Sequence, residues 1–294
     1  MSRQGEEREL FAPGHRMCAG CAEGIAVRNI LKEAGPHTIA AIATGCLEVV
    51  STAYPQTAWE IPVIHAAFEN AASVAAGVEV ALRELGRKEG VNVMAFAGDG
   101  GTFDIGFQAL SGMLERGHDV TYVCLDNEAY MNTGIQRCSS TPWGASTTTS
   151  PPGSCSKGES QPKKPLAAIC AAHDIPYAAT ATVAYIKDLR CKVRKALDTE
   201  GPAFLHVFTP CPTGWRHGSD DSVELSRLAV ETGVFVLWEA VDGDICNLKV
   251  TYKPKKRKPV AEYLKKQRRF GHLTDEDIQR IQQEVDEKWE KLED

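Results

Sequence analysis

The sequence predicts an α/β protein built on a mainly parallel sheet with helices on both faces. Short, continuously apolar runs alternate along the chain with longer segments of helical character. Continuous apolar runs are typical of strands buried on both faces, and helices between them form the crossover connections of a parallel sheet. With 294 residues, the chain can bury one large core or two medium ones.

The expected elements follow one another in this alternation. Strands are expected at residues 38–44, 91–97, 120–125, 203–208 and 234–238. Helices are expected at residues 69–85, 105–116, 165–173 and 185–198. No internal repeat interrupts the order.

Two stretches break the pattern. Residues 139–165 are crowded with Ser, Thr, Pro and Gly, and a loop of this length inside a domain is usually functional or mobile. From about residue 247 the chain carries a basic run, 253–258, and then an expected amphipathic helix, 275–292. The apolar stripe of this helix consists of Ile278, Ile281, Val285, Trp289 and Leu292. It is either a surface helix or part of an arm that embraces a partner subunit.

These breaks divide the chain into three parts. Residues 1–16 are expected to form a tail, 17–246 the main domain, and 247–294 a C-terminal basic arm and helix.

Composition excludes several classes of protein. A net charge of −6 argues against a nucleic-acid-binding protein. No apolar run is long enough for a transmembrane helix, and residues 1–9 lack the apolar core of a signal peptide. We therefore expect a cytoplasmic protein that binds neither membranes nor nucleic acid. In that reducing compartment, ten cysteines indicate a metal site together with buried structural thiols.

The strongest local motif is Gly98-Asp99-Gly100-Gly101, which directly follows an expected strand, while Asn127 follows the next strand. The carboxyl ends of parallel strands meet at the ligand-binding edge of the sheet. A carboxylate and an amide oxygen suit Mg²⁺, and glycines allow backbone amides to approach a diphosphate closely. The motif therefore predicts a Mg²⁺–diphosphate site.

A second motif is the C-x-x-C pair Cys18 and Cys21. Such a pair fits zinc, an iron–sulfur cluster or a redox dithiol. Zinc would need a second close ligand pair, and neither Cys46 nor Cys211 has another cysteine or histidine two to four residues away. Both of these cysteines directly follow expected strands, so four thiolates from separate loops can meet, as a [4Fe–4S] cluster requires. The alternative that Cys46 and Cys211 are ordinary thiols stays open.

The spacing from the GDG motif to Asn127 resembles the signature of thiamine-diphosphate enzymes. Between about residues 15 and 240, the chain also resembles the β subunit of pyruvate:ferredoxin oxidoreductases in the 2-oxoacid:ferredoxin oxidoreductase family. The similar segments are HRMCAGCAEG, ATGCLEVVSTAYP, TAWEIPVIHAAFENAASVAAG, AGDGGTFDIGFQALSGMLERGHDVTYVCLDNEAYMNTGIQR and TPCPTGW. The resemblance implies a thiamine-diphosphate-binding fold and reversible, CoA-dependent oxidation of pyruvate with reduction of ferredoxin.

The resemblance also implies roles for individual residues. Cys18, Cys21, Cys46 and Cys211 would ligate the [4Fe–4S] cluster, while Asp99, Asn127 and the Ala129 carbonyl would hold Mg²⁺. The cofactor-binding residues expected beside these metal ligands are Glu23, Thr44, Gly45, His65, Gly98, Gly100, Gly101, Asn132 and Thr133, with Cys46 again among them. For His65, a packing or hydrogen-bonding role is equally open.

One α/β unit accounts only for the diphosphate side of thiamine diphosphate. We therefore assign no catalytic residue to this chain and expect the activating glutamate on a partner subunit. The implied partners are α-, γ- and δ-type subunits that carry the pyrimidine-side thiamine domain, a CoA domain and a ferredoxin-like unit. Ferredoxin, CoA and a 2-oxoacid complete the expected set.

Alternatives remain at three levels. The substrate could be 2-oxoisovalerate, 2-oxoglutarate, indolepyruvate or oxalate. A cluster-free thiamine decarboxylase subunit and an iron–sulfur electron carrier are rivals of other classes. The six cysteines without an assigned role are Cys124, Cys138, Cys155, Cys170, Cys191 and Cys246, of which Cys124, Cys170 and Cys191 fall inside expected elements and are expected to pack as small apolar residues.

Overall fold

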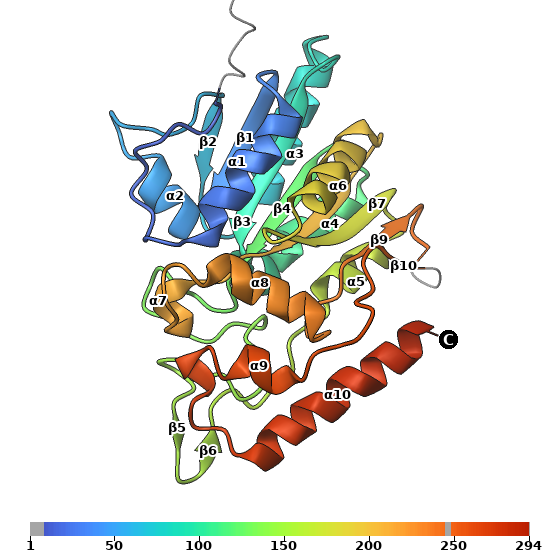
Figure 1. Cartoon of the computed structure of the whole chain (residues 1–294). Coiled ribbons are helices and arrows are strands. Elements are labelled where there is room, and N and C mark those ends of the chain that lie inside the picture. The colour runs from blue at the N-terminus through green and yellow to red at the C-terminus, as the bar shows by residue number, and fades with distance from the viewer. Residues whose placement is uncertain (1–8, 245–247, 294) are drawn as a thin grey trace, which may run out of the picture.

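An eight-stranded sheet forms the centre of the computed structural model, which describes residues 9–244 and 248–293 (Figure 1). The strand order is β10-β9-β7-β8-β4-β3-β1-β2. The pairings of β9 and β10 are antiparallel, and all other pairings in this sheet are parallel. The strands are β1 (Thr38–Ala43), β2 (Val63–Ala66), β3 (Asn92–Gly98), β4 (Thr121–Asp126), β7 (Tyr177–Thr182), β8 (Ala203–Phe208), β9 (Trp238–Val241) and β10 (Lys249–Val250). The predicted fold class is confirmed.

Helices cover both faces of the sheet. One face packs against α1 (Ala22–Ala34) and α6 (Ile186–Asp198), and the other against α3 (Ala71–Glu84), α4 (Phe107–Glu115) and α5 (Leu166–Ala171). The alternation along β3 explains both layers, because Met94 and Phe96 join the first core while Val93, Ala95 and Ala97 join the second. All four predicted helices are present. A π-helical turn, Gly101–Ile105, precedes α4.

The predicted strand at 234–238 is wrong, since β9 begins only at Trp238. Residues 234–237 instead belong to the connection between α8 (Ser222–Glu231) and β9. In this connection the Phe235 N–H donates to the Ala229 carbonyl. The Thr180 hydroxyl then bonds both the Val236 carbonyl, at 2.7 Å, and the Trp238 N–H, at 2.9 Å. This side chain bridges the segment to β7, so the apolar run is buried without forming a ladder.

The C-terminal segment folds back over its own chain. It forms α9 (Val260–Leu264), a 3₁₀ turn (Arg268–Phe270) and α10 (Asp275–Glu293). Helix α10 confirms the predicted amphipathic helix, with Val285 and Trp289 buried and the rest of the predicted stripe partly buried. The apolar stripe is therefore used within the chain, and contact of this segment with a partner stays a prediction. The predicted domain boundary at 246/247 and Cys246 lie outside the described residues.

Trp289→Ala is expected to lower the free energy of unfolding by about 3–5 kcal/mol, because a large buried side chain leaves a cavity. Its indole is 1% exposed, and its N–H donates to the Gly233 carbonyl at 3.0 Å. Denaturant unfolding measures the change. Glu290→Ala, on the exposed side of the same helix, should alter stability by no more than about 0.5 kcal/mol. Equal effects of the two substitutions would show that α10 contributes no core.

No helix in the described ranges is both long and apolar enough to span a bilayer.

Candidate functional site

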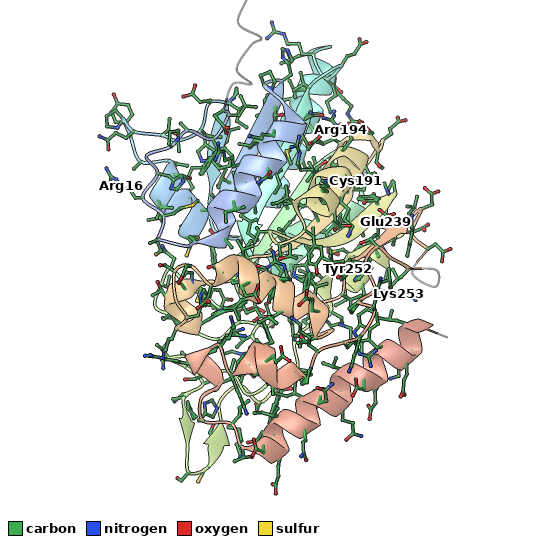
Figure 2. All side chains as sticks on the ribbon, in the orientation of Figure 1. Arg16, Cys191, Arg194, Glu239, Tyr252 and Lys253 are labelled. Atoms are coloured by element: carbon green, nitrogen blue, oxygen red, sulfur yellow. The ribbon has the colours of Figure 1, made fainter. Side chains whose placement is uncertain are left out.

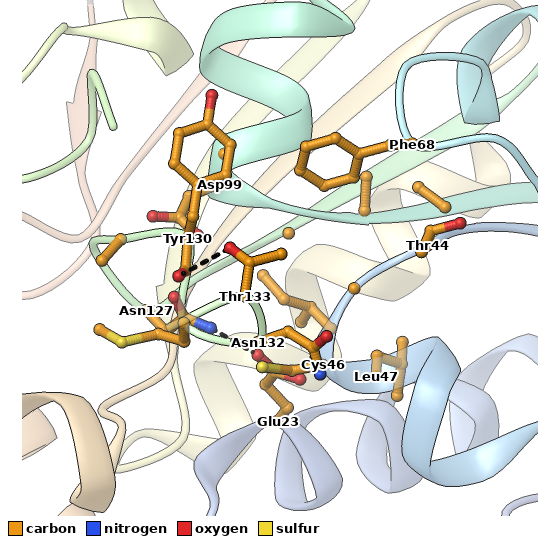
Figure 3. Close-up of a pocket in the computed structure, with 18 of the residues that line it drawn as sticks. Glu23, Thr44, Cys46, Leu47, Phe68, Asp99, Asn127, Tyr130, Asn132 and Thr133 are labelled. Carbon is orange, nitrogen blue, oxygen red and sulfur yellow. Dashed lines mark hydrogen bonds between the residues drawn. The ribbon is translucent and has the colours of Figure 1, made fainter. Parts of the chain in front are cut away.

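A pocket of about 280 Å³ opens at the carboxyl ends of β1, β3 and β4 (Figure 3). This is the edge at which open parallel sheets bind ligands. The predicted site residues that line the pocket are Glu23, Thr44, Gly45, Cys46, Gly98, Asp99, Gly100, Asn127, Ala129, Asn132 and Thr133. Its apolar walls come from Leu47, Phe68, Phe96 and Met131, which the motifs did not single out. The topology thus brings together residues from five separate parts of the sequence.

Two predicted residues do not line the pocket but contact residues that do. His65, on β2, is hydrogen-bonded to the Thr44 hydroxyl at 2.8 Å, and its other ring nitrogen is 3.4 Å from the Glu48 carboxylate. Gly101 begins the π-helical turn, and a Cβ there would lie 3.0 Å from the Phe68 carbonyl oxygen. Both residues therefore support lining residues and do not themselves line this pocket.

Asp99 is a buried carboxyl group at the end of β3. It is 1% exposed, and its side chain accepts a hydrogen bond from the Cys138 thiol at 3.1 Å. Burial and then the charge of Asp126 hold the pKa of Asp99 well above its usual range. A buried carboxylate is stable only beside compensating positive charge, so the Asp99 environment fits a bound cation. Cys138 gave no sequence signal for this contact.

Asn127 presents a second oxygen to the pocket. Its amide nitrogen donates to Glu23 at 2.8 Å, which fixes the orientation of the amide. The Asn127 Oδ1 atom is buried without a hydrogen-bond partner among the described residues. Asp99 and Asn127 together offer the hard oxygen donors that Mg²⁺ prefers, so the residues present fit this ion.

Glu23 lies between the two predicted metal sites. Burial raises the pKa of Glu23 to about 7, although the hydrogen bond from Asn127 opposes the shift. Its second oxygen, Oε2, has no partner among the described residues. Glu23 therefore orients the Asn127 amide through one carboxylate oxygen, and its other oxygen, Oε2, can bind a ligand in the pocket.

The four predicted cluster cysteines lie at the same end of the molecule. Cys21 precedes α1, Cys46 begins α2 (Cys46–Ser51), and Cys211 precedes α7 (Pro212–Trp215). Burial raises the pKa of the Cys211 thiol to about 11. Burial, and then the charges of Glu23, Cys211 and Cys21, raise the pKa of the Cys46 thiol. Cys18 accepts a contact from the Thr213 hydroxyl at 3.8 Å. Thiols with raised pKa values become thiolates only beside positive charge, which the irons of a cluster would supply.

Within the described ranges, no three His, Cys, Asp or Glu side chains converge closely enough to hold a single metal ion. A four-iron cluster differs from a zinc site, because each thiolate binds a different iron and the sulfurs need not share one point. The donor set is therefore compatible with a cluster and does not form a one-ion site.

The remaining cysteines divide by burial. Cys124 and Cys170 are buried, as expected of small apolar residues, and so is Cys138. The expectation for Cys191 is wrong, since it lies on the exposed side of α6 (Figure 2). Cys155 is exposed at the tip of the hairpin formed by β5 (Pro152–Gly153) and β6 (Ser156–Lys157).

Comparison with known proteins agrees with this geometry. Residues 43–207 match the family described as thiamine pyrophosphate enzyme, C-terminal TPP binding domain. Pyruvate synthase subunit PorB of Methanocaldococcus jannaschii is 57% identical over 98% of both chains. The PorB subunit of Methanothermobacter marburgensis is 60% identical over 97% of this chain and 98% of its own. Ketoisovalerate oxidoreductase subunit VorB of Pyrococcus furiosus is 46% identical over 97% of this chain and 92% of its own.

A solved structure supports the fold. The 2-oxoglutarate:ferredoxin oxidoreductase from Magnetococcus marinus aligns with a TM-score of 0.59 and 21% identity, over 76% of this chain and 81% of that chain. Fold and family match together define a thiamine-enzyme subunit. The chain belongs to the 2-oxoacid:ferredoxin oxidoreductase family, among the β subunits of pyruvate synthases, as the sequence predicted.

Proposed function

We propose that this chain binds Mg²⁺–thiamine diphosphate and the proximal [4Fe–4S] cluster of a multi-subunit pyruvate:ferredoxin oxidoreductase. The complex would convert pyruvate and CoA reversibly to acetyl-CoA and CO₂ while reducing ferredoxin. The observation that carries the proposal is a pair of buried oxygen donors, the Asp99 carboxylate and the Asn127 Oδ1 atom, which has no partner among the described residues, in a pocket at the carboxyl edge of the sheet.

Several groups in the pocket have a defined task in this proposal. Asp99, Asn127 and the Ala129 carbonyl would hold Mg²⁺, and the backbone around Gly98 and Gly100 would approach the diphosphate. Bound thiamine diphosphate supplies the carbanion chemistry for decarboxylation. The apolar walls exclude water from the reacting end of the pocket, and they include Phe68 and Phe96.

The position of Cys46 connects the two cofactors. Cys46 lines the pocket, begins α2 and is one of the four predicted cluster ligands. A [4Fe–4S] cluster bound there would accept electrons one at a time directly beside the site of decarboxylation. Electrons from the reaction in the pocket would then leave this chain through the cluster bound at Cys46.

The site is incomplete without other subunits. The carboxylates that line the pocket are Glu23, which is bonded to Asn127, and Asp99, which is proposed to hold the metal. The glutamate that activates the aminopyrimidine ring and the cation that holds the substrate carboxylate would therefore come from a partner. CoA-binding and ferredoxin-like subunits complete the complex.

A 2-oxoisovalerate enzyme is the second candidate, because a ketoisovalerate oxidoreductase subunit is 46% identical to this chain. Pyruvate is favoured by identities of 57% and 60% to pyruvate synthase subunits. Anaerobic purification of the complex, followed by a screen of 2-oxoacids for CoA-dependent reduction of ferredoxin or viologen, tests both. We expect the highest kcat/KM with pyruvate and no turnover by this chain alone. A colourless complex would indicate a cluster-free enzyme, and a complex without thiamine diphosphate would indicate an electron carrier.

Glu23→Ala is expected to weaken Mg²⁺–thiamine diphosphate binding about tenfold or more, because residues that orient metal ligands contribute this much to affinity. Glu23→Gln, which keeps a carbonyl acceptor for Asn127, should lose less. Titration calorimetry of the cofactor-stripped complex measures the dissociation constant. Glu33→Ala serves as the control, since it removes a carboxylate of the same helix that pairs with Arg190 on α6. An unchanged constant in Glu23→Ala would exclude the orienting role.

A further inference from the structure

We propose that Arg269 is a positioning residue for residues 127–129, so that the C-terminal segment completes the cofactor site of the main domain. The inference rests on the proposed function, because it takes this turn as the place where Mg²⁺ is held. None of the sequence motifs pointed to Arg269.

Arg269 is buried in the 3₁₀ turn after α9 and is 2% exposed. Its Nη2 atom donates to the Glu128 carboxylate at 2.5 Å, and its Nε atom donates to Gln267 at 2.9 Å. The Arg269 carbonyl accepts from the Ser146 N–H at 2.9 Å, which ties the turn to the long loop after β4. The guanidinium is therefore held in place from several directions.

Glu128 is the residue between the two proposed metal donors, Asn127 and Ala129. Its backbone is left-handed, with φ of 68°, a conformation that is unfavourable for a non-glycine residue and persists only where the surrounding structure holds it. Its carboxylate is bound on one side by Arg269 and on the other by Lys163, at 2.8 Å. These two cations anchor the side chain and so stabilise the turn that directs the Asn127 amide and the Ala129 carbonyl.

Trp215 provides a second connection to the same turn. The Arg269 guanidinium stacks on the Trp215 ring at 3.8 Å. The indole N–H of Trp215 donates to the Asn127 carbonyl at 2.7 Å, and its backbone N–H donates to the Cys211 carbonyl at 2.9 Å. Arg269 thus contacts Glu128, within residues 127–129, and Trp215, which is hydrogen-bonded to Asn127. Trp215 is also hydrogen-bonded to the backbone of Cys211, a predicted cluster ligand.

A positioning role and simple charge balance predict opposite results. Lys163 already binds Asp126 at 2.5 Å, so without Arg269 two buried carboxylates would share one lysine. If Arg269 acted only through charge, its removal would make the site more negative and strengthen Mg²⁺ binding. If it positions the turn, its removal weakens binding.

The test uses the complete complex, stripped of cofactor and titrated with Mg²⁺ at a fixed concentration of thiamine diphosphate. Arg269→Met should raise the dissociation constant about 10- to 100-fold, the range found for residues behind metal ligands. Arg269→Lys, which keeps the charge but loses the planar fork, should raise it less. The double variant Arg269→Met/Glu128→Gln should bind the cofactor no more weakly than the worse single variant. Both substitutions disrupt the same ion pair between Arg269 and Glu128, so their effects should not add.

Arg257 is a matched control on the same segment. It also lies over a tryptophan, Trp289, and binds a carboxylate, Asp286, at 2.8 Å. Arg257→Met should lower thermal stability without changing the dissociation constant. Unchanged or tighter binding by Arg269→Met, or additive losses in the double variant, would overturn the inference. If wild type fails to bind the cofactor, or Asp99→Ala binds normally, the proposed function fails instead.

Discussion

Asp99→Ala is expected to abolish Mg²⁺–thiamine diphosphate binding while the fold and the cluster persist. A residue behind a metal ligand contributes about 10- to 100-fold in affinity, so loss of the carboxylate ligand itself should exceed that range. The substitution also removes a buried carboxyl group whose charged form is poorly compensated. The melting temperature of the cofactor-free complex should therefore be unchanged or higher, which separates lost binding from lost folding.

Titration calorimetry and the reduced-state EPR signal measure the two halves of this prediction. Asp119→Ala is the control, because it removes a partly exposed aspartate that pairs with Lys88, outside the pocket. Full cofactor occupancy in Asp99→Ala would refute the metal assignment. A lost EPR signal would show that the two cofactor sites are one folding unit.

Cys211→Ser is expected to remove or degrade the [4Fe–4S] cluster and, with it, pyruvate-dependent reduction of ferredoxin. The Cys211 sulfur accepts the Gly214 N–H at 3.3 Å, so its position is fixed by the first turn of α7. A serine oxygen is a harder ligand than a thiolate and suits iron–sulfur clusters poorly. Iron content and EPR of the anaerobically purified complex measure the loss.

Cys191→Ser makes the same exchange of sulfur for oxygen on the exposed side of α6. It should leave iron content and EPR unchanged. An unaltered cluster signal in Cys211→Ser would mean that another residue is the fourth ligand, with Cys138 the first alternative because it is buried beside Asp99.

The pocket could be predicted from sequence because its two proposed metal-binding side chains, Asp99 and Asn127, directly follow strands. Continuous apolar runs identified β1, β3, β4 and β8, and a parallel sheet brings the ends of its strands to one edge. Asp99 and Asn127 therefore had to be neighbours. The strands β2 and β7 were not predicted. The sequence of β7, YAATAT, contains no Val, Ile, Leu or Phe, and β2 is a short edge strand with Ile64 and His65 exposed. Such strands depend on their neighbours more than on their own composition.

The supports of the pocket could not be predicted. Cys138 reaches Asp99 across 39 positions, and Lys163 reaches Glu128 across 35. No periodicity or spacing rule relates such residues, since the contacts depend on how the long loop and the C-terminal segment fold over the sheet. Local patterns therefore located the donors, while only the tertiary structure revealed what holds them.

The ion pair between Arg269 and Glu128 sets an order of events during synthesis. The two residues are 141 positions apart, so at about 5–20 residues per second the ribosome needs roughly 7–28 s to add the arginine after the glutamate. Throughout that interval the nascent chain carries the turn without Arg269, one of its two anchoring cations. We therefore expect cofactor loading to follow translation, when the last part of the polypeptide has emerged and closed over the first.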